Sequence, residues 1–70
     1  MIRERVKIAG MGCNHCVNAV REALAELGVD IHQVEIGYAE VSYDPELDSK
    51  RIDAAITEAG YEPLQHETLA

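Results

Sequence analysis

Apolar and polar residues alternate with a period of two in several stretches of the chain, and this pattern is typical of half-buried strands. Near the N-terminus, Val6 and Ile8 are flanked by charged residues, which predicts a strand over residues 2–9. The same alternation recurs in the middle of the chain. There it predicts an antiparallel pair of strands over about 31–36 and 39–44.

Two other stretches carry apolar residues at the three- and four-residue spacing of amphipathic helices. In the first stretch, these positions are Val17, Val20, Leu24 and Leu27. We expect this helix to run from Asn14 to Leu27, with the Asn14 side chain as its N-cap and Gly28 as its end.

The second helical stretch has its apolar positions at Ile52, Ala55, Ile56 and Ala59. We expect Asp48 or Ser49 to cap its start and Gly60 to end it.

The remaining segments predict a turn and a last strand. Gly37-Tyr38 suits a two-residue type II′ turn between the two middle strands. A short strand should follow the second helix, from Tyr61 to about His66. Pro63 has no N–H to donate to a neighbouring strand, so we expect this strand at an edge of the sheet.

The predicted element order is β-α-β-β-α-β, in a single domain over residues 1–70. Both helices must bury an apolar face, and the sheet has one apolar face to offer. With right-handed crossovers, these constraints predict an α+β, ferredoxin-like fold. It would consist of a four-stranded antiparallel sheet with two helices on one face.

Composition excludes several functional classes. The 70-residue chain has a net charge of −7, so we expect no nucleic-acid partner, because phosphate binding needs a basic surface. No stretch approaches the roughly 20 apolar residues of a membrane span, and the charged N-terminus lacks the apolar region of a secretory signal. We therefore expect a protein that is cytoplasmic and not membrane-embedded.

The chemistry of the chain centres on Cys13 and Cys16, its only cysteines. They follow the first predicted strand and begin the first predicted helix, where backbone N–H groups and the helix dipole favour thiolates. A pair with this spacing could be a disulfide, a redox pair, half of a zinc site or a complete site for another ion.

The number of available ligands favours a soft ion. Zn²⁺ prefers four ligands, and His15, His32 and His66 lack the paired spacing that would supply the other two. Cu(I) selects thiolates and needs few of them. We therefore expect Cu(I) to be bound by the two cysteines.

Three landmarks resemble those of a known family. Residues 10–16, GMGCNHC, are similar to the GMxCxxC signature of heavy-metal-associated domains. Residues 43–45 (YDP) and 59–63 (AGYEP) are similar to later landmarks of that family. The resemblance runs from about Val6 to Leu64 and is greatest to bacterial copper(I) chaperones. The family also includes metal-binding domains of P-type ATPases and mercuric-ion binding proteins.

The resemblance implies roles for individual residues. It places the metal ligands on the two cysteines and places Met11 in the core beneath the loop. Tyr61 would either shield the metal loop or pack as an ordinary core tyrosine. His15 would face solvent, screen the thiolates or join a site shared in a dimer. Gly12 lacks the acidic side chain that zinc- and cadmium-exporting members often carry there, which favours Cu(I).

The resemblance implies a metal carrier and not an enzyme. We expect a Cu(I) chaperone that passes its ion by ligand exchange to the metal-binding domain of a copper-transporting P-type ATPase. The alternatives are the N-terminal metal-binding domain of such an ATPase, a mercuric-ion binding protein and a thiol-disulfide redox protein. The metal-free protein should be a monomer, and copper could bridge two loops in a dimer.

Overall fold

The computed structural model describes residues 1–69, and Ala70, the last residue of the predicted 1–70 domain, lies outside the described residues. Within this range the elements follow in the order β1 (Ile2–Ala9), α1 (Asn14–Leu27), β2 (Asp30–Glu35), β3 (Tyr38–Tyr43), α2 (Ser49–Glu58) and β4 (Glu62–Thr68). The predicted order of strands and helices is confirmed.

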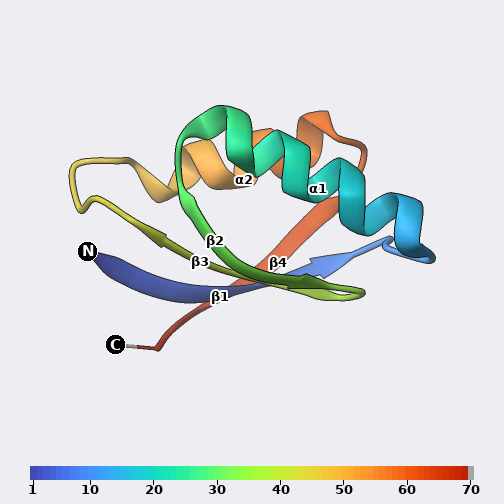
Figure 1. The fold of residues 1–70 in the computed structure, drawn as a ribbon, viewed down its shortest axis with the longest axis horizontal. Helices are drawn as coiled ribbons and strands as arrows, with labels where there is room; N and C mark the ends of the chain where they lie inside the picture. Colours follow the sequence, from blue (N-terminus) through green and yellow to red (C-terminus); the bar gives the residue numbers. More distant parts are fainter. Residues whose placement is uncertain (70) are drawn as a thin grey trace.

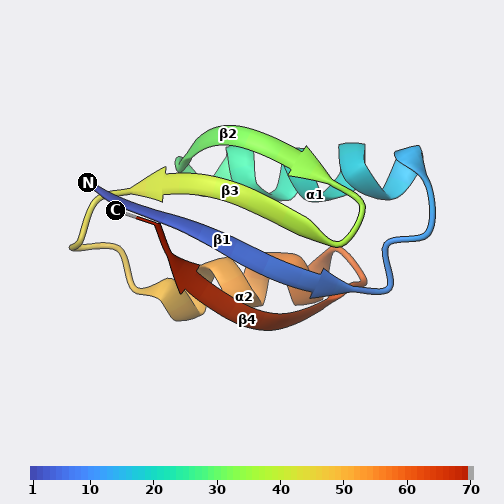
Figure 2. The ribbon, with the colours of Figure 1, turned by 90° about the horizontal axis from the view of Figure 1, so that it is seen from below.

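The strands of residues 1–69 form a sheet in the order β2-β3-β1-β4, and every neighbouring pair is antiparallel. Figure 1 shows both helices above the sheet, and Figure 2 shows them behind it when the sheet is seen from below. The predicted ferredoxin-like arrangement, with two helices on one face of the four-stranded sheet, is confirmed.

The core lies between the helices and the sheet and is built mainly from aliphatic side chains. Its buried members are Val6, Ile8, Met11, Val20, Leu24, Val29, Val34, Ala39, Val41, Tyr43, Ile52 and Ile56. Of the apolar positions that the spacing identified, Val20 and Leu24 of α1 and Ile52 and Ile56 of α2 are buried, and the others are partly exposed. Neither helix of residues 1–69 is long and apolar enough to cross a membrane.

The bounds of α1 match the prediction, but its cap does not. Cys13 is the N-cap residue, with an extended φ of −161°, and its carbonyl accepts a 3.0 Å hydrogen bond from the N–H of Cys16. No side chain caps this helix, and Asn14 is its first helical residue, so the prediction of an Asn14 cap is wrong. Because Met11 is held in the core, the chain turns into the helix before it reaches Asn14.

The other helix ends follow the prediction. Gly28 ends α1 with a left-handed φ of +89°, a conformation that glycine adopts without steric cost. The carboxylate of Asp48 caps α2 by accepting a 2.9 Å hydrogen bond from the N–H of Lys50. Gly60, with φ +99°, follows α2 and lets the N–H of Tyr61 reach back into its last turn.

The turn between β2 and β3 lies one residue earlier than predicted. Its two central residues are Ile36 and Gly37, and Tyr38 already belongs to β3. A type II′ turn needs a positive φ at its first central residue, but here the positive φ of +100° is at Gly37, the second. Ile36 is consequently 52% exposed and does not continue the buried face of β2.

Strand β4 lies at an edge of the sheet, as the proline predicted. It begins one residue after Tyr61 and extends two residues past His66. The register with β1 shifts between the pairs Lys7–Gln65 and Ile8–Pro63, which leaves Leu64 without an opposite residue. Such a bulge is common where a proline interrupts an edge strand, and it leaves Leu64 59% exposed.

Replacement of Leu24 tests the core. This side chain is fully buried in α1, so Leu24→Ala should lower the free energy of unfolding by about 2–5 kcal/mol through the cavity that it leaves. The same change at the exposed Leu64 should stay within about 0.5 kcal/mol of the parent protein. Urea unfolding followed by circular dichroism measures both. Equal losses for the two variants would contradict the described core.

Candidate metal-binding site

The loop between β1 and α1 lies at the end of the sheet where β1 stops (Figure 2). Cys13 ends this loop as the N-cap residue of α1, and Cys16 lies in the first turn of that helix. Gly10 starts the loop with a left-handed φ of +91°. Met11 is 6% exposed and belongs to the core, as the family resemblance implied. A Cβ atom at Gly10 would lie 3.7 Å from Cδ1 of Tyr61, so the ring of that tyrosine lies beside the loop. Met11 thus anchors the loop to the core, and the ring of Tyr61 lies at its side.

The two thiols lie close together without forming a disulfide. The Sγ atoms of Cys13 and Cys16 are 3.7 Å apart, well beyond the roughly 2.05 Å of a disulfide bond. Cys13 is exposed and Cys16 is partly buried against the core. The structure thus brings together both predicted site residues, at the surface and as free thiols.

The surroundings of Cys16 favour its thiolate. A hydrogen bond from the Tyr61 side chain, followed by backbone hydrogen bonds from Gly12 and Cys13, lowers the pKa of the Cys16 thiol to about 7. Because hydrogen bonds to the charged form stabilise it, thiol and thiolate are both well populated at neutral pH. Cys16 is therefore ready to act as a soft anionic ligand without a strong base.

Tyr61 lies beside the loop, which is one of the two roles that the family resemblance implied, and the structure adds its effect on Cys16. It packs against the core, and its hydrogen bond to Cys16, with burial second, raises the pKa of the Tyr61 hydroxyl. The hydroxyl therefore keeps its proton and acts as the donor. The AGYEP landmark signals a tyrosine after α2. Only the folded chain shows that this tyrosine meets Cys16.

The three histidines contribute no third ligand to the loop. His32 forms a 2.6 Å hydrogen bond with Ser42, and His66 forms hydrogen bonds with Glu4 and Asp53. His15 is exposed in the first turn of α1. Among residues 1–69, no group of three or more His, Cys, Asp and Glu side chains is placed to hold a metal ion. The loop therefore offers two sulfur ligands.

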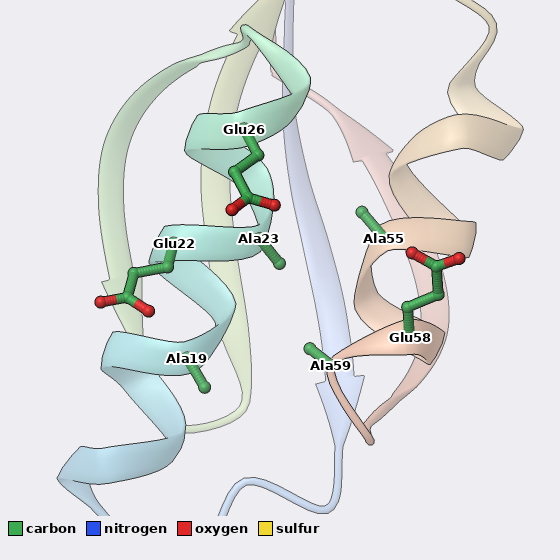
Figure 3. Close-up of a pocket in the computed structure, with 7 residues that line it drawn as sticks. All are labelled: Ala19, Glu22, Ala23, Glu26, Ala55, Glu58 and Ala59. Atoms are coloured by element: carbon green, nitrogen blue, oxygen red, sulfur yellow. The ribbon is translucent and has the colours of Figure 1, made fainter.

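A separate groove of about 360 Å³ lies between the two helices. Figure 3 shows small alanine side chains pointing into it from both helices, with carboxylates along its sides. Its lining consists of Ala19, Glu22, Ala23, Glu26, Ala55, Glu58 and Ala59. This lining carries no thiol, imidazole or hydroxyl group, so the candidate chemistry lies in the cysteine loop.

Comparison with known proteins agrees with this geometry. The family model of the heavy-metal-associated domain matches residues 5–62. The chain belongs to the heavy-metal-associated domain family.

Relatives of this heavy-metal-associated domain include copper chaperones. The domain is 39% identical over 66 residues to the copper chaperone CopZ of Bacillus subtilis, which covers 89% of this chain and 96% of that protein. It is 34% identical over 59 residues to the copper chaperone CopZ of Archaeoglobus fulgidus. That match covers 84% of this chain but only 29% of the relative, so the chain spans less than a third of that protein.

Solved structures support the same assignment. The crystal structure of a copper binding domain from HMA7, a P-type ATPase, superimposes with a TM-score of 0.79 at 31% sequence identity. The match covers 100% of this chain and 96% of that one. The fold is therefore shared over the whole heavy-metal-associated domain.

Replacement of Tyr61 tests the electrostatics of the loop. In metal-free protein carrying Cys13→Ser, the absorbance of the thiolate should report a Cys16 pKa near 7. Tyr61→Phe removes the hydroxyl donor and should raise that pKa toward the ordinary value of 9.0. Tyr38→Phe, on the sheet face away from the loop, is the matched control and should leave the titration unchanged. An unaltered pKa in Tyr61→Phe would show that this hydrogen bond is absent.

Proposed function

We propose that this domain binds one Cu(I) ion through the thiolates of Cys13 and Cys16 and delivers it to another protein. The observation that carries the proposal is the pair of accessible thiols 3.7 Å apart, one of them with a pKa lowered to about 7. This arrangement supplies two soft anionic ligands on a surface loop. The relatedness to copper chaperones and to a copper-binding ATPase domain supports copper as the cargo.

The ligand set favours Cu(I) over harder or more demanding ions. Cu(I) is stable with few thiolate ligands, whereas structural Zn²⁺ sites use four ligands. The histidines of the sheet form hydrogen bonds elsewhere, and Gly12 supplies no carboxylate. Hg(II) also accepts two thiolates, so a mercuric-ion binding protein is the competing assignment for the same residues.

The open coordination of the loop suits transfer. A thiolate of a receiving protein can approach the exposed side, where Cys13 lies, and add to the copper ion before one of the original ligands leaves. The ion then moves between proteins without being released into water. Tyr61 assists by donating a hydrogen bond to Cys16 once that sulfur is free, which stabilises the emptied loop.

The receiving protein in this proposal is a copper-transporting P-type ATPase, through its own metal-binding domain. The domain acts in the cytoplasm as a binding protein and not as an enzyme, and is monomeric without metal. A second arrangement, in which this domain is itself the N-terminal part of such an ATPase, is supported by the 31% sequence identity over the whole chain to the copper binding domain of HMA7, a P-type ATPase. The mass of the native gene product distinguishes the two arrangements.

Titration with copper tests the proposal. Reduced protein, titrated anaerobically with Cu(I) against a chromogenic chelator, should bind one ion and withhold it from the chelator. Cys13→Ser and Cys16→Ser should each abolish tight binding, because a single thiolate cannot hold the ion against the chelator. His32→Gln is the control and should bind as the parent protein does.

Two results would overturn this assignment. One is retention of Cu(I) no stronger than micromolar by the parent protein, together with much tighter binding of Hg(II) in a parallel competition. The other is reduction of insulin by the metal-free protein, which would indicate a thiol-disulfide enzyme.

Exposure to air should inactivate the loop. The two sulfurs need to approach by less than 2 Å to form a bond, so oxidation should give an intramolecular disulfide. Mass spectrometry would detect the loss of two hydrogens, and Cu(I) binding would be lost until a reductant is added. Two free thiols that persist through prolonged aeration would contradict an accessible pair.

A further inference from the structure

His66 lies between two carboxylates that belong to different elements. Its Nδ1 atom is 2.9 Å from Oε1 of Glu4 on β1, and its Nε2 atom is 2.7 Å from Oδ1 of Asp53 on α2. His66 itself belongs to β4, the edge strand. One side chain therefore connects the last strand to both of the elements against which it packs.

Both contacts require a proton on each ring nitrogen. A neutral imidazole has a single N–H, whereas an ionised carboxylate can only accept hydrogen bonds. A neutral His66 would therefore donate to one carboxylate and turn a lone pair toward the other. Only the imidazolium form satisfies Glu4 and Asp53 together. The geometry thus defines the protonation state in which this cluster is complete.

The burial of this cluster makes the loss of one of its hydrogen bonds unfavourable in free energy. The side chain of Glu4 is 11% exposed and that of His66 is 23% exposed, so water replaces a lost partner poorly at both. Asp53 is 42% exposed and has more freedom to turn toward solvent. The contact between α2 and β4 is therefore the first to open when the ring loses a proton.

The charged groups that face His66 are Glu4 from β1 and Asp53 from α2. Tyr43, from β3, also faces this cluster, because Glu4 contributes to the shift of its pKa. Burial makes the larger contribution and a hydrogen bond with Glu4 the next one, and together they raise the pKa of Tyr43 to about 12, so its hydroxyl stays protonated. Burial by itself would lower the pKa of His66, but the hydrogen bonds and charges of the two carboxylates outweigh it, and that pKa is raised above 6.5.

We propose that the protonated His66 locks the edge strand β4 onto α2 and β1, and that loss of its proton loosens this strand. The lock is a pH-dependent conformational device, and it does not rest on the copper-binding function. Strand β4 is suited to such a device because it has a neighbouring strand on one side only. Its register with β1 is also interrupted at Leu64.

The direction of the pH dependence follows from the sign of the shift. A group whose pKa is higher in the folded than in the unfolded state stabilises the fold while it is protonated. The contribution of His66 is therefore fully present below about pH 6.5 and is lost as the pH rises through its raised folded-state value. Loosening of β4 is expected in mild base and not in mild acid.

Hydrogen exchange of the metal-free protein tests the lock. Protection factors, corrected for the intrinsic pH dependence of exchange, should fall several-fold for β4 amides between pH 6 and pH 8.5 and should change less for β3. His66→Gln should show low protection of β4 at pH 6 and no further fall. His32→Gln, which alters a histidine bonded to Ser42 and to no carboxylate, should behave as the parent protein does.

Two further measurements keep the proposal falsifiable if His66→Gln fails to fold. An NMR titration of the His66 ring should give a pKa above 6.5, and Asp53→Asn, at a half-exposed position of α2, should lower it. A ring pKa at or below 6.5 would overturn the lock. So would a pH dependence of β4 protection that is equal in the parent protein and in either variant.

Discussion

The packing of aliphatic side chains between one face of the sheet and the two helices determines where the chain leaves β1 and enters α1. Met11 is part of that packing, Cys13 follows it as the N-cap residue of α1, and Cys16 lies in the first turn of that helix. Because Met11 is buried in the core, it anchors the start of the loop. The two sulfurs follow this anchor and lie 3.7 Å apart, within hydrogen-bond distance of each other and without a disulfide.

The same packing brings Tyr61 to the loop. Helix α2 lies beside α1, and Gly60, which follows the C-cap residue Ala59, has a left-handed φ of +99° that directs the chain back toward the sheet. Tyr61 then meets Gly10 and Cys16, which come from the opposite end of the sequence. A neutral hydroxyl donor beside a thiol stabilises the anion without adding a positive charge that would compete with a bound cation. The site thus combines soft ligands with a neutral donor.

Charged side chains connect the elements at the other end of β1. There the cluster around His66 joins three elements through an imidazolium between two carboxylates. On the opposite face of the sheet, Arg5 donates two hydrogen bonds to Glu40, at 2.7 and 3.1 Å. Both clusters connect β1 to a neighbouring strand, so polar contacts supplement the ladder hydrogen bonds of a small sheet.

Local patterns were sufficient for the elements, because the periods of two and 3.6 residues reflect which positions face the core. The element order, the end of α1 at Gly28, the Asp48 cap and the edge position of β4 all follow from residue types that act over a few positions. The cysteine pair was visible for the same reason. The prediction of an Asn14 cap was wrong because Met11 is held in the core and the chain enters the helix before Asn14. The predicted Gly37-Tyr38 turn was wrong because Gly37, with its positive φ, takes the second central position of the turn and not the first.

The sequence by itself determined the fold class, the positions of the two thiols and their setting at the start of a helix. Those features depend on periodicity, glycine placement and spacing, which are properties of neighbouring residues. Only the tertiary structure decided that Tyr61 lies beside the loop and lowers the pKa of Cys16, and that His66 lies between Glu4 and Asp53. These contacts join residues far apart in the chain, and their geometry exists only once the core has brought the strands and helices together.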